Sequence, residues 1–251
     1  DTRKKEGEAA MKKQDKIIPM NDIFDENEAV KYMKSYMFIK GFAFGKGLRQ
    51  TILSLAVARR LHEGQYRKDG TPYISHPLKV CTTLISYGIE DDVTLSAALL
   101  HDVLEDCKEK LPLEGSELVL EYGLDQEILE IIRLLTKESG LDDYELSVYF
   151  KRIEENPKAA LIKLADRLHN SSTLYTFSNE RMKKYLRETK KFMIPMASYC
   201  KKYYPEYNNA FCILKNNIEM LNSTMMVMLE KLEEGAKGKR EEENEYGRAV
   251  L

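Results

Sequence analysis

Four side chains that can bind a metal or move a proton lie within six positions, as His101, Asp102, Glu105 and Asp106. The run before them, VTLSAALL, is apolar and rich in strong helix formers, so it predicts a helix. If that helix continues, Glu105 lies one turn after His101 and Asp106 one turn after Asp102, on the same faces. Such groups at the end of a buried helix are costly unless they are paired, hydrated or bound to a metal. The His-Asp doublet favours a metal site over the alternative, a solvated acidic helix end.

Two other stretches supply further metal-binding groups. His76 lies just before the start of a predicted helix, and Asp166 lies in the predicted helix ALIKLADRLHN. Lys163, Asp166 and Asn170 fall at i, i+3 and i+7, so one face of that otherwise apolar helix is polar. Two imidazoles and two carboxylates suit a borderline divalent ion such as Mn²⁺, Fe²⁺ or Zn²⁺, with open positions for water.

The acidic residues one turn beyond the doublet, Glu105 and Asp106, are then placed to take a proton from the attacking water. The other two histidines, His62 and His169, each follow an Arg-Leu pair inside a predicted helix. We interpret both as structural or surface groups rather than as metal ligands.

The composition limits the classes of partner. The 251 residues include 39 basic and 41 acidic ones, which give a net charge of −2, so the whole chain does not favour electrostatic binding of nucleic acid. No apolar run approaches the roughly 18–20 residues of a membrane span, and no signal-peptide pattern opens the chain. The cysteines show no C-x-x-C spacing; they are Cys81, Cys107, Cys200 and Cys212. We therefore expect a cytoplasmic protein with reduced thiols.

Helical periodicity, together with Gly, Pro and Asp at the ends of the apolar runs, predicts an all-α chain. The expected helices cover residues 25–41, 48–63, 77–87, 116–122, 125–136, 142–155, 157–173, 179–203 and 205–231, with one more that begins at Asp91 and carries His101. The glycine-rich stretch 41–47 is interpreted as a turn between helices, because it lacks the spacing and the hydroxyl residue of a phosphate-binding loop.

The chain divides into four predicted segments. Residues 1–24 are expected to form a disordered tail, in which Met11 is a candidate natural start. Residues 25–203 are expected to form one helical domain, and residues 204–232 a helical extension behind it. Residues 233–251 are charged and lack an apolar stripe, so a loose tail is expected.

The metal-binding residues resemble the H…HD…D signature of the HD-domain phosphohydrolases, carried here by His76, His101, Asp102 and Asp166. The hydrolase domain of RelA/SpoT-type proteins is similar in four stretches: GQYRKDGTPYISHP (64–77), HDVLED (101–106), LTK (135–137) and KLADRLHNSSTL (163–174). The resemblance covers about residues 48–197, and small stand-alone relatives include a metazoan SpoT homologue. It implies an HD-domain helical bundle with a C-terminal helical extension.

The resemblance also implies roles for individual residues. Four side chains would hold a single Mn²⁺, namely His76, His101, Asp102 and Asp166. Two carboxylates would position and activate the attacking water, Glu105 and Asp106. Two basic side chains would pack along the nucleotide, Arg67 and Lys68, and two polar ones would contact its base and sugar, Asn170 and Thr173.

The family reaction removes the 3′-pyrophosphate from ppGpp or pppGpp and yields GDP or GTP with pyrophosphate. A highly charged leaving group needs a metal and nearby cations, and the nucleophile needs a carboxylate base, which these residues can supply. The chain has no room for the synthetase domain of long members. A stand-alone hydrolase of this kind would serve either in general alarmone turnover or as the antidote to a partner alarmone synthetase.

Two alternatives stay open. Cys107 stands where many relatives have Thr, a change expected to affect only packing, whereas Ser171-Ser172 replace a bulkier Met-Arg pair, a change expected to bear on base or phosphate preference. One alternative is a related phosphohydrolase that acts on (p)ppApp or NADPH. The other is a non-catalytic, nucleotide-sensing module on a decayed HD scaffold. All the ligand and acidic positions are filled, which argues against decay.

Overall fold

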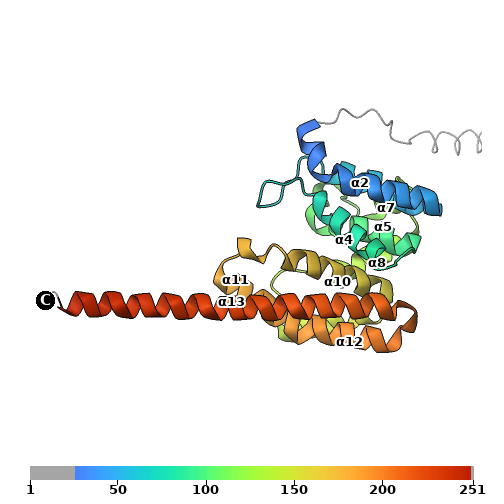
Figure 1. Cartoon of the computed structure of the whole chain (residues 1–251). Helices are drawn as coiled ribbons and strands as arrows, with labels where there is room; N and C mark the ends of the chain where they lie inside the picture. Colours follow the sequence, from blue (N-terminus) through green and yellow to red (C-terminus); the bar gives the residue numbers. More distant parts are fainter. Residues whose placement is uncertain (1–25, 250–251) are drawn as a thin grey trace, which may run out of the picture.

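The computed structural model describes residues 26–249, with side chains over residues 32–174 and 176–233, and every regular element in this range is a helix (Figure 1). An isolated bridge between Tyr66 and Pro72 is the nearest approach to a strand within it. The predicted all-α class is confirmed. The tail predicted over residues 1–24 lies outside the described residues.

The longer helices are α2 (Glu26–Lys46), α3 (Arg49–Leu61), α4 (Ser75–Ser86), α5 (Asp92–Leu100), α8 (Gln126–Leu135), α9 (Asp143–Glu154), α10 (Pro157–Ser171), α11 (Asn179–Glu188), α12 (Ile194–Tyr203) and α13 (Asn208–Ala249). The short ones are α6 (Val103–Asp106), η1 (Lys108–Lys110), α7 (Ser116–Leu120), η2 (Leu174–Thr176), the π-helical η3 (Thr189–Met193) and η4 (Pro205–Tyr207). Most boundaries lie within a few residues of the predicted ones.

Helix α5 forms the centre of the core because it is apolar on all sides. Its residues 94–100 are buried, and it contacts α3, α4, α8 and α10. Asp91 caps the helix by accepting a hydrogen bond from the backbone N–H of Thr94 at 2.7 Å. Asp92 reaches across to α3, where its carboxylate accepts a bond from the backbone N–H of Thr51 at 2.7 Å. The acidic pair therefore starts α5 and fixes α3 beside it.

Helix α10 is the second central element. Asn156 caps its start by accepting a hydrogen bond from the N–H of Ala159, and Pro157 fits the first turn. Its apolar face packs against α4, α8, α9, α12 and α13. Its polar face carries Lys163 and Asp166, as the spacing predicted, and Asp166 lies against His101 at the end of α5.

The structure corrects the predicted turn over residues 41–47. Helix α2 continues through Gly41 and Gly45 to Lys46, and the chain turns at Gly47, which has a φ of 70°. The continuation is stabilised by burial, because Ile39 and Ala43 lie one turn apart on the face that packs into the core. Lys46 forms an ion pair with Glu90 at 2.8 Å.

The C-terminal part also differs from the sequence prediction. One π turn, η3, separates α11 from α12 within the expected helix 179–203. Helix α13 packs on α10 and α12 and then continues as helix to Ala249, beyond the body of the molecule (Figure 1). The expectation of a loose tail from residue 233 was wrong for residues 233–249, because a segment rich in Ala, Glu, Lys and Arg favours helix without an apolar stripe. The division into domain and extension stays a prediction.

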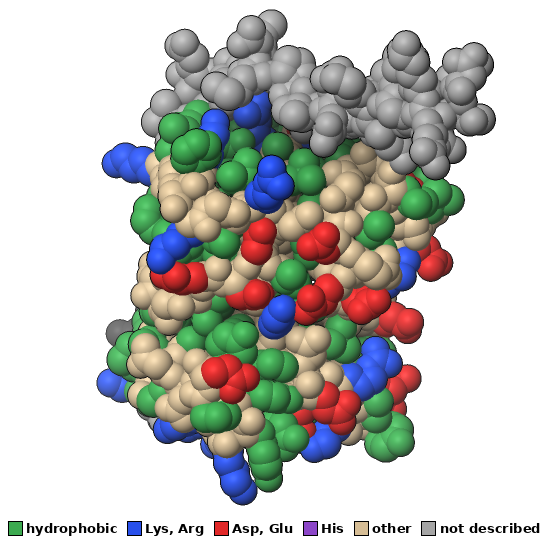
Figure 2. All heavy atoms as spheres, turned by 90° about the vertical axis from the view of Figure 1, so that its right-hand side faces the viewer, with side chains coloured by type: hydrophobic (Ala, Val, Ile, Leu, Met, Phe, Trp, Pro, Cys, Tyr) green, Lys and Arg blue, Asp and Glu red, His purple; other side chains and the backbone are tan. Residues whose placement is uncertain are grey.

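Figure 2 shows one face of the molecule, on which acidic and basic side chains lie among apolar ones without an extended basic area. This face offers no concentrated positive charge of the kind that holds a polyanionic backbone. Within the described part of the chain, no helix combines the length and the apolar character needed to cross a bilayer.

Candidate metal centre and substrate cleft

The His-Asp doublet lies where α5 ends and α6 begins. His101 follows the last residue of α5, and the chain keeps helical backbone angles through Asp102 into α6. The Nδ1 atom of His101 lies 2.9 Å from the carbonyl oxygen of Ala98. Because a carbonyl can only accept, Nδ1 carries a proton, so Nε2 is the nitrogen that can bind a metal in exchange for its own proton. The helix end thus fixes the imidazole in the tautomer that a metal ligand needs.

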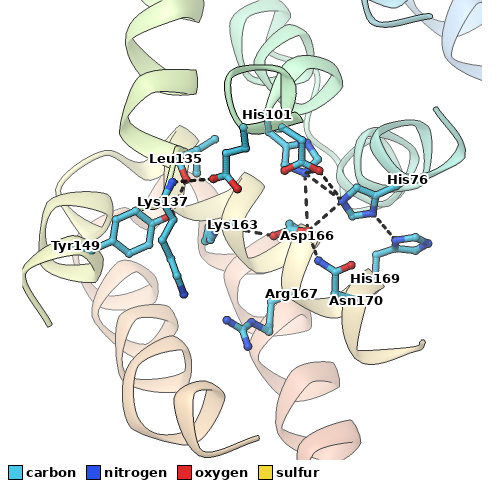
Figure 3. A network of polar contacts seen from close by, with 12 residues as sticks. His76, His101, Leu135, Lys137, Tyr149, Lys163, Asp166, Arg167, His169 and Asn170 are labelled. Carbon is cyan, nitrogen blue, oxygen red and sulfur yellow. Dashed lines mark hydrogen bonds and ion pairs between the residues drawn. The ribbon is translucent and has the colours of Figure 1, made fainter. Parts of the chain in front are cut away.

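Four side chains predicted as ligands converge from α4, the α5–α6 junction and α10 (Figure 3). The Nε2 atoms of His76 and His101 are 3.2 Å apart. The Oδ2 atom of Asp102 lies 3.3 Å from His76 Nε2 and 3.2 Å from His101 Nε2. The Oδ1 atom of Asp166 lies 3.2 Å from His76 Nε2 and 3.8 Å from His101 Nε2. The fold therefore brings residues from three parts of the chain to one point.

This donor set fits a divalent cation. One donor atom from each of His76, His101 and Asp102 lies within 4.8 Å of the others. Burial disfavours charge on His101, but the carboxylates of Asp102 and Asp166 raise its pKa well above the usual range. Burial likewise disfavours ionised Asp102 and Asp166, but the imidazoles together lower the pKa of both carboxyls well below their usual range. The cluster thus favours positive charge at its centre, and two nitrogens with two oxygens suit a borderline ion.

Two residues outside the predicted set support the ligands. His169 Nδ1 lies 2.7 Å from His76 Nδ1, and burial, followed by the electrostatic effect of the neighbouring His76, lowers the pKa of His169 to about 3, so the ring of His169 is neutral. Tyr73 donates a hydrogen bond from its hydroxyl to Asp102 Oδ2 at 2.7 Å. The ring of Tyr73 stacks on His62, with centroids 4.8 Å apart. Supporting contacts of this kind orient metal ligands.

These supporting roles were missed in the sequence. His169 and His62 were interpreted as structural or surface groups rather than metal ligands. The structure buries His62 against Tyr73 and places the half-buried His169 against the predicted ligand His76. Tyr73 precedes His76 by three residues, which was the available local signal. The contact of His169 with His76 spans 93 positions and left no local signal.

The two carboxylates predicted to act on water, Glu105 and Asp106, line the same cleft as Asp102 and Asp166. Desolvation raises the pKa of Glu105, and the backbone N–H of Lys137, which donates to its Oε1 at 2.7 Å, partly opposes that rise. A carboxyl with a raised pKa is a stronger base when ionised, which suits it to accept a proton.

The predicted substrate residues lie around Asn170. Its side-chain nitrogen donates to Asp166 Oδ1 at 2.5 Å, and its oxygen accepts from Arg67 Nη2 at 3.3 Å. Thr173 donates its hydroxyl proton to the backbone oxygen of Asn170 at 3.1 Å. The ammonium of Lys68 lies 5.7 Å from the centre of the Phe177 ring. All four predicted residues line the cleft, and Asn170 links them to the metal-ligand cluster.

The cleft has a volume of about 730 Å³. Its walls carry seven cationic side chains: Arg67, Lys68, Lys137, Lys163, Arg167, Arg181 and Lys184. The ammonium of Lys163 lies 3.7 Å from Asp166 Oδ2. Figure 3 shows Lys137, Lys163 and Arg167 on the same side of Asp166. A carboxylate cluster beside so many cations suits a small, highly charged anion bound next to a metal.

The comparisons with known proteins agree with this geometry. The sequence profile of the HD domain matches residues 54–198, so the chain belongs to the HD-domain family. HD domains are metal-dependent, and the His/Asp cluster supplies the donors for such an ion.

Three curated relatives carry the same domain within longer chains. A GTP pyrophosphokinase of Streptomyces coelicolor is 36% identical over 163 residues, which is 60% of this chain and 18% of that protein. The guanosine-3′,5′-bis(diphosphate) 3′-pyrophosphohydrolase of Borreliella burgdorferi is 32% identical over 211 residues, covering 79% of this chain and 31% of that protein. The bifunctional (p)ppGpp synthase/hydrolase SpoT of Escherichia coli is 36% identical over 158 residues, covering 61% and 21%. The chain thus spans less than a third of each of these relatives.

The solved structure of a metazoan ortholog of SpoT, described as hydrolysing ppGpp, superposes with a TM-score of 0.55 at 24% identity. The match covers 70% of this chain and 96% of that one, and it shows that the fold is shared. The resemblance to RelA/SpoT-type hydrolase domains that the motifs predicted is confirmed by these alignments.

Proposed function

We propose that this chain is a metal-dependent hydrolase that removes the 3′-pyrophosphate of ppGpp or pppGpp and releases GDP or GTP with pyrophosphate. The observation that carries the proposal is one cleft lined by His76, Asp102 and Asp166 together with two further carboxylates and seven cations. His101 is buried behind this wall, with its Nε2 atom 3.2 Å from His76 Nε2. The names of the aligned relatives support the choice of substrate.

The metal would be held by His76, His101, Asp102 and Asp166, and we propose Mn²⁺, for which Fe²⁺ and Zn²⁺ would be the substitutes. When bound, it would supply a Lewis acid that stabilises charge on the phosphoryl oxygens and acidifies water. The chain orients each of these side chains by a contact of its own. The carbonyl oxygen of Ala98 contacts His101, and His169 contacts His76. Tyr73 donates to Asp102, and Asn170 donates to Asp166.

We propose that Glu105 and Asp106 orient the attacking water and take its proton. The water oxygen forms a bond to the phosphorus attached to the ribose 3′-oxygen, and the bond between that phosphorus and the 3′-oxygen breaks. The 3′-oxygen ends with a proton, so one water is consumed for each pyrophosphate released. The desolvated carboxyl of Glu105 is suited to the proton transfer.

The remaining residues would bind and place the nucleotide. Arg67 and Lys68 would pack along it, and Asn170 and Thr173 would contact its base and sugar. The hydrogen bonds of Asn170 to Arg67 and to Asp166 support this placement, because they join the predicted nucleotide side of the cleft to the ligand side. Neither Ser171 nor Ser172 is among the described residues that line the cleft, so these departures from the family offer the nucleotide no direct contact there.

The cellular setting is also part of the proposal. Cys81, Cys107, Cys200 and Cys212 are all free thiols, which supports a reducing, cytoplasmic location. There the hydrolase would oppose an alarmone synthetase, by general turnover or as its antidote.

The test is analysis of the products formed from ppGpp by the purified chain with and without Mn²⁺. GDP and pyrophosphate that appear only with Mn²⁺ are the expected result. Turnover of ppApp or NADPH in preference to ppGpp would contradict the proposed substrate. Absence of metal binding and of any Mn²⁺-induced rise in Tm would favour a non-catalytic nucleotide-sensing module.

A further inference from the structure

We propose that Glu188 is a positioning residue for the water-activating carboxylate Glu105, acting through Lys137. The inference rests on the proposed function, since it concerns one of the two residues to which we give the proton transfer. Glu188 is the last residue of α11, 83 positions from Glu105, and no motif of the sequence singles it out.

The carboxylate of Glu188 lies between two cations. Its Oε2 atom is 3.1 Å from the ammonium of Lys137, and its Oε1 atom forms an ion pair with the guanidinium of Arg167. Burial disfavours the ionised form of Glu188, but Arg167 and Lys137 lower its pKa below the usual value. The side chains of Glu188 and Arg167 are only 13% and 6% exposed, so solvent screens their attraction weakly. Glu188 is therefore a charged, doubly paired anion.

The same lysine holds the catalytic carboxylate through its backbone. The N–H of Lys137 donates to Glu105 Oε1 at 2.7 Å. Lys137 lies just beyond the end of α8, where Leu135 O accepts a hydrogen bond from the Tyr149 hydroxyl at 2.6 Å. The segment that presents this N–H is thus fixed from α9 by Tyr149 and from α11 by Glu188. Loss of the second anchor would remove the contact that holds the Lys137 side chain to α11.

The other partner of Glu188 ties it to the ligand cluster. Arg167 directly follows Asp166 on α10 and stacks on the Tyr185 ring at 3.9 Å. Its Nη1 donates to Thr189 Oγ1 at 3.1 Å, at the first residue of the π-helical turn η3. Single π turns inside α-helices occur frequently at functional sites. Here the π turn begins directly after Glu188, whose side chain pairs with Lys137 beyond the end of α8 and with Arg167 of α10.

Direct contact of Glu188 with the substrate is disfavoured by charge. Both carboxylate oxygens are already bound to cations, and an anion placed against a pyrophosphate would repel it. The trio of Lys137, Arg167 and Glu188 keeps a net charge of +1, so it remains attractive to the substrate while Glu188 fixes its geometry.

The experiment compares Glu188→Gln with the wild type by hydrogen exchange of the peptide that contains the Lys137 amide. The substitution keeps the shape and removes the charge, so we expect faster exchange at Lys137. We also expect a fall in kcat for ppGpp of about tenfold to a hundredfold, with KM and bound metal near their wild-type values. A role confined to stability would lower Tm without this division between kcat and KM.

Asp143→Asn is the matched control, because it breaks the exposed pair of Asp143 with Lys191 at 2.6 Å, which also joins η3 to α9. It should change neither exchange at Lys137 nor kcat. The double variant Glu188→Gln/Lys137→Met should lose no more kcat than Lys137→Met alone, because both act on one contact.

Losses in kcat that multiply in the double variant would overturn the proposal, as would unchanged exchange at Lys137 in Glu188→Gln. If the wild-type chain does not hydrolyse ppGpp, the proposed function fails, and the exchange measurement still decides whether Glu188 holds Lys137.

Discussion

The two halves of the cleft are built differently. The ligand half consists of the proposed metal ligands His76, His101, Asp102 and Asp166, and it is largely buried and internally paired. The side chains of His76 and His101 are 2% and 3% exposed, and each contacts the carboxylates of Asp102 and Asp166. The cationic half combines the buried, ion-paired Arg167 with exposed side chains such as Lys68 and Lys184, which come from a turn and from helix α11. The difference indicates that the whole ligand half is preorganised, whereas the exposed cations of the other half attract an anion without a fixed partner geometry. The two halves should therefore respond differently to substitution.

The largest effect is expected for His101→Ala. It removes a proposed ligand and leaves the buried Asp166 and the largely buried Asp102 without one of their partners, so both bound metal and turnover of ppGpp should be lost. Metal analysis and a rate assay check this, with Tm measured to confirm that the variant folds. A variant that retains stoichiometric metal would break the assignment of the ligand half.

Asp106→Asn should separate chemistry from metal binding. The carboxamide cannot accept the proton of water, so turnover should fall by about 10²–10⁴-fold while metal content stays near the wild-type level. Rate assays and metal analysis on the same preparation measure both. Near-normal turnover would show that Asp106 does not activate water, and would leave Glu105 as the base.

Tyr73→Phe should weaken the ligand half without dismantling it. The ring can still stack on His62, but the hydrogen bond to Asp102 is lost, so the affinity for Mn²⁺ should fall by about tenfold. A titration of the metal-free protein with Mn²⁺ measures the change. Tyr144→Phe, at an exposed tyrosine outside the cleft, is the control. Equal affinities in both variants would contradict the supporting role.

The smallest effect is expected for Lys68→Ala in the cationic half. An exposed cation contributes mainly to attraction, so KM should rise about threefold with kcat unchanged, and added salt should reduce the difference. Steady-state kinetics at low and high ionic strength test this. Lys108→Ala, at an exposed lysine outside the cleft, should leave KM unchanged. A fall in kcat or in bound metal for Lys68→Ala would remove the distinction between the two halves.

Much of the fold could be predicted because the signals for helix ends are local. Asp142 and Glu145 form a capping box at the start of α9, and Asn156 with Pro157 starts α10. The errors arose where local signals and packing disagree. Gly41 would end a helix by propensity, but the burial of nearby residues of α2 carries the helix past it.

The sequence by itself determined the residue types of the ligand half, since His76, His101, Asp102 and Asp166 stand in motifs that a single chain displays. It could not determine what supports them. His169 meets His76 across 93 positions, and Glu188 meets Lys137 across 51. Such contacts depend on how α4, α8, α10 and α11 pack, and packing is decided by the whole core rather than by any short stretch. The chemistry was therefore readable in the sequence, and its orientation was decided only by the tertiary structure.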